Sequence, residues 1–431
     1  MFWSILFTII YGAFIYYVFS YARIKFLGAT AHPIGLFFVI QILIFSMPGV
    51  LMVSFFDVSS ERYFGINNDE LVTIGIWYLY AVTVMLLIVL FLFKGLGLYR
   101  YQFELNKIRE FDFDAHWSGC ILIICFCVVT IVLQQLLFEA PPIYHLMTGD
   151  SELAYLTRVD MQENPEKYYP PYVRFALNFI NIFQVYYVYF FYCRLKIKKL
   201  SHALYLFISL AIATYQALYE TQKAPIVFIL IGLSFIGYLN SPKIVSNIIK
   251  IIFIFVGVIL FSSLIIDADF NSAFTGVIDR VFLGQNQGFY QIISNIKPDE
   301  KYWFQDVYFA GSLGVNPSRA DVDVIPYIYG DRDDVVNVNS FFLGQAWSMF
   351  GELGLIISPF IVATSISIFI MICDKLIKIS PTIFIPFMIY TIPSLSINQS
   401  FTQFLYGKYF ILNFICIFIF YFCMKFVHKI K

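Results

Sequence analysis

The chain has 431 residues, of which 60% are hydrophobic and 13% are charged. A soluble domain cannot bury so much apolar surface, so the composition predicts a membrane protein. The formal net charge is zero, which gives no support to a nucleic-acid partner.

Eleven apolar runs approach the roughly 20 residues that a membrane-spanning helix needs. The first run has no basic residue before it and no small-residue cleavage site after it, so we expect a retained span and not a removed signal. The predicted spans are 2–20, 34–56, 71–93, 117–138, 171–193, 203–219, 224–239, 248–266, 349–372, 381–397 and 408–424. The sixth and seventh are short.

Basic residues mark one set of joints between these runs. The joints after the odd-numbered spans hold 17 of the 28 Lys and Arg residues, while acidic residues concentrate in the other joints. By the positive-inside rule, the N-terminus is outside and the C-terminus cytoplasmic. The chain then divides into residues 1–266, with spans one to eight and an outer loop at 139–171, a large extracytoplasmic loop at 267–340, and residues 341–431, with the last three spans and a short cytoplasmic tail.

The late loop is the most polar part of the chain, with eleven acidic and five basic residues. A structureless loop of that length is uncommon, so we expect it to be partly helical and functional. Within it, apolar residues from Asn271 to Ile296 recur at helical spacing. Arg280 and Gln287 fall on the opposite face. They predict an amphipathic helix at the outer membrane surface that presents both side chains to water or lipid headgroups, the alternative being a merely solvated arginine.

A second polar group follows at Arg319, Asp321, Asp323, Tyr327 and Tyr329. The Asp-x-Asp spacing could hold a divalent ion, as in transferases that use nucleotide sugars. Such donors are cytoplasmic whereas this loop is predicted outside, so we favour one of these carboxylates as a general base, with solvation of the loop as the alternative.

Other candidates lie at the same predicted face. Lys223, in the tight turn between two spans, is either functional or a lysine that extends to the interface. His145 is the one outer histidine and shares its loop with Arg158. Glu352 follows Gly351 where the ninth span begins.

Together these residues suit a lipid-linked diphosphate sugar. Arginines bind phosphate oxygens in a bidentate manner, and tyrosines offer flat surfaces to sugar rings. Cations would stabilise the leaving diphosphate, and a carboxylate or His145 would take the proton of the acceptor hydroxyl. No nucleotide-binding motif is present, which argues against an ATP-driven pump, and nothing in the sequence demands a metal or another cofactor. The seven cysteines show neither metal-ligand nor disulfide spacing.

The chain resembles the Wzy-type polymerases of O-antigen and capsule repeat units. The likeness covers the topology of ten or more spans with two sizeable outer loops, the larger one late. Locally it rests on Thr-Gln-Lys-Ala-Pro at 221–225, on Arg-Val-Phe-Leu-Gly-Gln at 280–285, on the run Asn-Ser-Phe-Phe to Phe-Gly-Glu-Leu-Gly at 339–354, and on an R-x10-G match of Arg319 with Gly330. Neither Arg158 nor Arg174 has the corresponding glycine.

This resemblance implies an all-α polytopic membrane protein with GT-C-like architecture in a bacterial inner membrane. It implies transfer of a growing glycan from undecaprenyl diphosphate to a new lipid-linked repeat unit at the outer leaflet, with a Wzz-type chain-length co-polymerase as partner. An O-antigen ligase and a lipid-linked oligosaccharide flippase are the alternatives. The candidate bases are Asp321, Asp323, His145 and Glu352, the candidate diphosphate or substrate ligands are Arg280, Arg319, Lys223, Arg158, Gln287, Tyr327 and Tyr329, and the structural glycines are Gly330 and Gly351.

Overall fold

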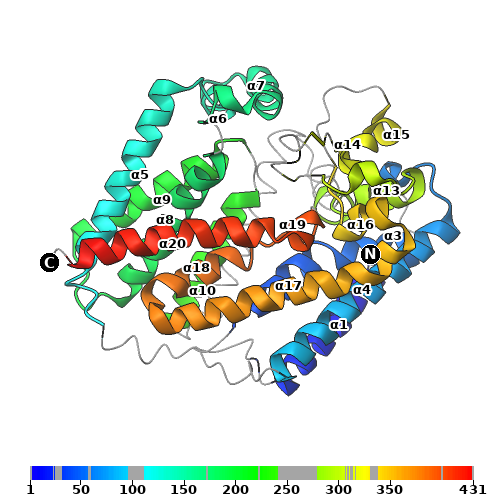
Figure 1. The fold of residues 1–431 in the computed structure, drawn as a ribbon, viewed down its shortest axis with the longest axis horizontal. Coiled ribbons are helices and arrows are strands. Elements are labelled where there is room, and N and C mark those ends of the chain that lie inside the picture. Colours follow the sequence, from blue (N-terminus) through cyan, green and yellow to red (C-terminus); the bar gives the residue numbers. More distant parts are fainter. Residues whose placement is uncertain are drawn as a thin grey trace.

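The computed structural model has helices and no strands among the residues it describes (Figure 1). These are residues 2–22, 24, 32–56, 60–95, 111–170, 173–221, 224–240, 279–305, 307, 310, 314–315, 317–330, 338–398 and 401–429.

Seven helical segments in this part of the chain are long and apolar enough to cross a membrane. One of them, Ile34–Phe55, consists of α2 (Ile34–Phe37), a π-helical stretch (Phe38–Ile44) and α3 (Met47–Phe55). The other six are α1 (Phe2–Tyr21), α4 (Asn68–Gly95), α5 (Trp117–Leu137), α9 (Leu200–Leu218), α17 (Glu352–Ile379) and α20 (Lys408–Lys429). The chain is therefore a polytopic membrane protein.

Three more predicted spans coincide with helices that are shorter or more polar. They are α8 (Arg174–Arg194), α10 (Ala224–Asn240) and α18 (Pro381–Thr391). The span predicted at 248–266 lies outside the described residues, so the total of eleven stays a prediction.

Short helices lie between the long ones. In the 139–171 loop they are α6 (Pro142–Met147), α7 (Ser151–Glu163) and a 3-10 turn (Pro165–Lys167). The late segment contains a π turn (Asp279–Leu283), α13 (Gln287–Asn295), a 3-10 turn (Glu300–Tyr302), α14 (Ala320–Asp323), α15 (Ile325–Tyr329) and α16 (Phe342–Phe350), and α19 (Thr402–Leu405) precedes α20. In Figure 1, α6 and α7 lie at the top of the view, apart from α14 and α15 at its upper right.

Helix α8 is buried at the centre of one half of the molecule, against α5, α9, α10, α18 and α20. Its polar side chains bond to neighbouring helices and not to lipid. Asn181 accepts a hydrogen bond from Thr130 Oγ1 of α5 at 3.0 Å and donates to Gln216 Oε1 of α9 at 3.0 Å, while Gln184 donates to the Ser209 carbonyl at 2.7 Å. Such interhelical bonds satisfy polar groups that would be costly in hydrocarbon. This explains why a span of low hydropathy can lie inside the bundle.

The other half of the molecule is built on α4, which packs against α17 and α1. The Tyr80 hydroxyl donates to the Ile356 carbonyl at 3.1 Å, so the first half of α4 lies beside the start of α17. At the opposite end, Lys94 donates to Tyr21 at 2.6 Å, and His32 Nε2 lies 4.0 Å from Asp374 Oδ1 in a buried position. The starts of α4 and α17 therefore share one end of the bundle.

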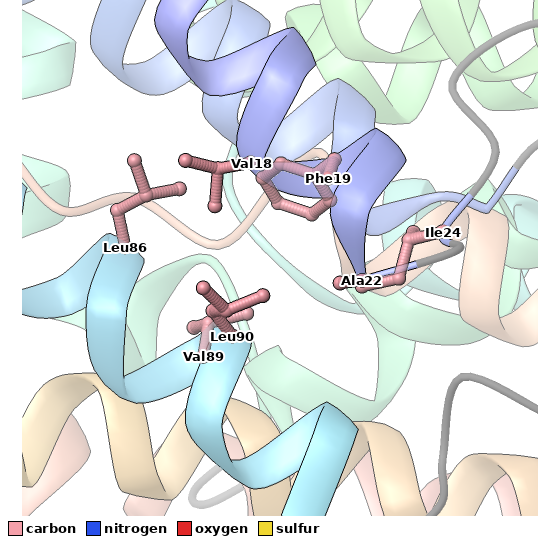
Figure 2. Close-up of a pocket in the computed structure, with 7 residues that line it drawn as sticks. All are labelled: Val18, Phe19, Ala22, Ile24, Leu86, Val89 and Leu90. Carbon is pink, nitrogen blue, oxygen red and sulfur yellow. The ribbon is translucent and has the colours of Figure 1, made fainter.

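An apolar gap separates parts of α1 and α4 (Figure 2). Val18 and Phe19 face Leu86, Val89 and Leu90, and no part of the space admits a water molecule. Its lining has no group that could bind a polar ligand or catalyse a reaction. It is a packing gap.

The polar contacts of α8 generate a stability prediction. We expect Asn181→Ala to lower the free energy of unfolding by about 1–2 kcal/mol, because Thr130 and Gln216 each lose one hydrogen bond inside the bundle. Thermal unfolding in detergent, followed by dye labelling of the buried thiols of Cys120, Cys127 and Cys373, measures the change. The control is Val129→Ala, since that side chain is 53% exposed on the outside of α5. Equal melting temperatures for the two variants would contradict the role given to the network.

Candidate functional site

The candidate site is built around Arg62, in the turn that joins α3 to α4. Ser60 caps this turn by accepting a hydrogen bond from the Arg62 amide at 3.3 Å. From the late segment, the Gln291 side-chain amide donates to the carbonyls of Arg62 at 3.1 Å and Phe64 at 3.4 Å. The backbone that carries Arg62 is thus held from both sides, at the end of the bundle where α4 and α17 begin.

The π turn and α13 are anchored on the Arg62 turn and on the residue that precedes α3. The buried Tyr63 hydroxyl donates to the Leu283 carbonyl at 2.6 Å, and its ring meets Tyr290 edge-on at 5.1 Å. Asn286 and Ser46 exchange two hydrogen bonds, of 3.0 and 3.1 Å. Burial raises the pKa of the Tyr63 hydroxyl well above its usual value, so this anchor stays protonated.

Four side chains then converge, and we call them the Arg62 cluster: Arg62, Asp279, Gln287 and Tyr329. Arg62 reaches Asp279 Oδ2 through Nε at 2.7 Å and through Nη2 at 2.6 Å, and its Nη1 donates to Gln287 Oε1 at 3.0 Å. The Tyr329 hydroxyl donates to the same Oε1 at 3.2 Å. Burial acts to lower the pKa of the guanidinium, but the hydrogen bond and charge of Asp279 outweigh it, so the pKa is raised and the cation is secure.

The Gln287 amide has one unused group. Because Arg62 can only donate, the atom that faces it must be the carbonyl oxygen Oε1, and this fixes the other amide atom as Nε2. Gln287 is only 2% exposed, and Nε2 has no hydrogen-bond partner among the described residues. A buried donor without a partner costs about 1–3 kcal/mol. The cluster therefore presents an unsatisfied N–H donor beside a cation, which is a combination that suits an anionic oxygen.

The expected exposure of Gln287 was wrong. The sequence predicted one amphipathic helix with this side chain directed to water, but a turn at residues 284–286 separates the π turn from α13. Helix α13 is covered by α4, α15, α16 and the Arg62 turn, so its polar side is buried as well as its apolar side. Arg280 belongs to the π turn, and its side chain lies outside the described part of the chain.

The two predicted bases on α14, Asp321 and Asp323, are both held by nearby cations. Arg319 donates to Asp321 at 2.6 and 3.3 Å. Asp323 accepts from Lys301 Nζ at 3.1 Å and from the Tyr302 hydroxyl at 2.8 Å. Burial and the bond to Asp323 raise the pKa of Tyr302 to about 12, and the bonds to Tyr302 and Asp323 raise the pKa of Lys301. These contacts hold α14 against the turn that begins at Glu300.

The two predicted glycines end helices. Gly330 closes α15 with φ +68° and Gly351 closes α16 with φ +60°, a backbone region that side chains other than hydrogen disfavour. Tyr327 is 60% exposed on α15. Glu352 is exposed in the first turn of α17, and none of the ion pairs among the described residues includes it.

The earlier outer loop forms a separate group. His145 is on α6 and Arg158 on α7, which Figure 1 draws away from α14 and α15. Nearby, Arg174 forms an ion pair with Glu220, which links the start of α8 to the end of α9. Lys223 lies outside the described residues. The described structure thus brings Gln287 and Tyr329 together but leaves His145 and Arg158 elsewhere.

Arg62 and Asp279 were not among the predicted site residues. Arg62 is the single basic residue in the joint between the second and third predicted spans, at a membrane edge where an arginine is costly unless it has a partner. Its position was the sequence signal that could have identified Arg62 as a candidate site residue. The partner is 217 residues away, and no local pattern points to it.

Comparisons of the chain with protein-family models, with curated proteins and with solved structures gave no match in any of the three. The resemblance to Wzy-type polymerases therefore rests on the sequence features described above.

Close approach of α3 to the π turn generates a prediction for the site. A Cβ on Gly49 would lie 2.0 Å from the Phe282 carbonyl oxygen, so one of the two backbones must move in Gly49→Ala. We expect a loss of about 1–3 kcal/mol in stability and faster amide hydrogen exchange in residues 279–291, because Asp279 shifts away from Arg62. Gly95→Ala is the control, since open space surrounds that position. Unchanged exchange at residues 279–291 would show that the contact does not position the turn.

Proposed function

We propose that this protein is a membrane glycosyltransferase that polymerises lipid-linked oligosaccharide repeat units. The donor is a glycan on undecaprenyl diphosphate, and the acceptor is a new lipid-linked repeat unit at the outer leaflet of a bacterial inner membrane. The product is an O-antigen or capsular polysaccharide. The observation that carries this proposal is the Arg62 cluster, with its buried donor beside a cation where two spans begin.

The chemistry of the cluster matches the diphosphate of such a donor. A guanidinium binds phosphate oxygens through paired N–H groups, and the free Gln287 N–H adds a neutral donor to the same anion. Arg62 lies between α3, which ends at Phe55, and α4, which begins at Asn68, so the cation is close to headgroup depth. A lipid diphosphate reaches that depth with its acyl chain still in the membrane.

Transfer requires stabilisation of the leaving group. The acceptor hydroxyl attacks the anomeric carbon, the bond from that carbon to the phosphate oxygen breaks, and the electron pair stays on the diphosphate. Arg62 and Gln287 would hold this charge as it develops. Arg280, Arg319 and Lys223 remain candidates for further phosphate contacts, and the exposed Tyr327 ring is a candidate surface for a sugar.

Gene deletion tests the function. We expect loss of the polymer ladder on a gel of surface polysaccharide, with one repeat unit still attached to the lipid A core. A strain that loses every repeat unit from the core would instead indicate a ligase or a flippase, and an unchanged ladder would contradict a role in the polysaccharide.

Complementation of the deletion tests the site. We expect Arg62→Ala to lower polymer yield at least about tenfold at equal protein level, because charge-assisted hydrogen bonds contribute about 1.5–3 kcal/mol. Arg62→Lys keeps the charge but not the paired geometry and should restore polymer only in part. Lys297→Ala is the matched control, since Lys297 is an exposed cation of the same segment. A full ladder from Arg62→Ala would show that the Arg62 cluster is not part of the active site, and it would not affect the conclusion drawn from the gene deletion.

A further inference from the structure

Asp279 is the carboxylate that pairs with Arg62. Both short contacts from the guanidinium, at 2.7 and 2.6 Å, go to one oxygen, Oδ2. The other oxygen, Oδ1, accepts one weaker bond from the Ser60 hydroxyl at 3.3 Å. Oδ1 is therefore held by one long hydrogen bond, whereas Oδ2 is held by two short contacts.

A phosphate can replace this carboxylate at little electrostatic cost. The carboxylate offers one oxygen to these N–H donors, whereas a phosphate can offer several, so the guanidinium keeps an anionic partner throughout the exchange. The side chains of Arg62 and Asp279 are 26% and 32% exposed, so a displaced Asp279 can be solvated and need not be buried as an unpaired charge. Gln287 Nε2 has no partner among the described residues, the Asp279 carboxylate included, and it offers an additional hydrogen bond to a phosphate. This bond favours exchange.

We propose that the diphosphate of the donor displaces Asp279 from Arg62, and that the released Asp279 carboxylate is the general base of the transfer. This inference rests on the function proposed above. The acceptor O–H bond breaks and its proton goes to Asp279, the acceptor oxygen forms the new bond to the anomeric carbon, and the bond from that carbon to phosphate breaks with its electron pair left on the diphosphate.

The competing carboxylates are less suited to this role. Asp321 is fixed by an arginine two residues away in sequence, and Asp323 is fixed by both Lys301 and Tyr302. Neither is bonded to Arg62 or Gln287 in the described structure, so diphosphate binding at the Arg62 cluster would not release them. Asp279 is the carboxylate of the Arg62 cluster, and binding of the donor would release it from Arg62.

The exchange also orders the reaction. Before the exchange, two N–H groups of Arg62 bond to Asp279 Oδ2 and occupy the oxygen that would accept the proton. The base becomes available when the diphosphate is seated. The same ion pair would thus limit unproductive proton removal before the donor is in place.

The experiment separates binding from transfer in the full-length protein in lipid nanodiscs. Undecaprenyl diphosphate is the binding probe, and formation of a glycan ladder from purified lipid-linked repeat units measures transfer. The variants are Asp279→Asn, Asp279→Glu and Arg62→Ala, and the control is Asp69→Asn, an exposed carboxylate at the start of α4.

We expect Asp279→Asn to bind undecaprenyl diphosphate as tightly as the wild type or up to about tenfold more tightly, because the competing anion is gone, and to lose about 10²–10⁴-fold in transfer rate. Asp279→Glu should restore part of the rate, because it returns a carboxylate to this position on a longer side chain. Arg62→Ala should weaken binding about 10- to 100-fold. Asp69→Asn should match the wild type in both measurements.

Several outcomes would overturn the proposal. If Asp279→Asn transfers the glycan at the wild-type rate, Asp279 is not the general base. If that variant binds the probe more weakly than the wild type, the carboxylate has a structural role. Equal binding by Arg62→Ala and wild type excludes the exchange. If the wild type binds undecaprenyl diphosphate but forms no ladder, both the proposed polymerase function and the role of Asp279 as a base are wrong. The displacement of Asp279 by the diphosphate is still tested by the binding affinities of Asp279→Asn and Arg62→Ala.

Discussion

The attachment of residues 279–291 to the joint between α3 and α4 is the constraint on which the rest of the site depends. Besides the bonds of Arg62 and Ser60 to this segment, polar contacts from the joint and from α3 hold it, among them Tyr63 to the Leu283 carbonyl, Asn286 to Ser46, Gln291 to the Arg62 carbonyl, and Ser54 to Tyr290 at 2.6 Å. Each replaces a bond to water at a place where apolar helices leave little water to bond to. A polar segment that could have remained a surface loop is held instead against the ends of two membrane helices, and Arg62 is brought to Gln287 across 225 residues of sequence.

Hydropathy predicted the helices well because lipid imposes one condition on every span, which is that backbone groups bond within the helix. Seven of the predicted ranges coincide with helical segments that are long and apolar enough to cross a membrane, and α8 shows how the rule extends. Its Asn181 and Gln184 lower its hydropathy, yet the range 171–193 was predicted and a helix is present at Arg174–Arg194. What sequence could not supply is the reason, namely that α5 and α9 provide the partners of those amides.

The candidate site was predicted less well, for a physical reason that differs from residue to residue. Gly330 and Gly351 were named as structural glycines with the family resemblance, and the structure gives both a positive φ, which is a local property of the backbone. Gln287 was placed on the wet face of a helix because periodicity describes one helix and says nothing of a second surface that covers it. Asp321 and Asp323 looked free in sequence, whereas Arg319 and Lys301 hold them. The pairing of Arg62 with Asp279 needed the fold, since only tertiary contact makes them neighbours.

The charge balance of the late segment shows why such pairing matters. Acidic residues outnumber basic ones between 267 and 340 by eleven to five, so the mean field of this segment opposes an anionic ligand. Water and salt screen that field over about 10 Å, whereas hydrogen bonds from a guanidinium and a buried amide act at contact distance in a region of low dielectric. An anion that arrives as the headgroup of a lipid is concentrated by its acyl chain and has no need of long-range attraction. A site with few cations, each fixed by bonds to its neighbours, is therefore compatible with a lipid diphosphate in a way that it would not be with a soluble one.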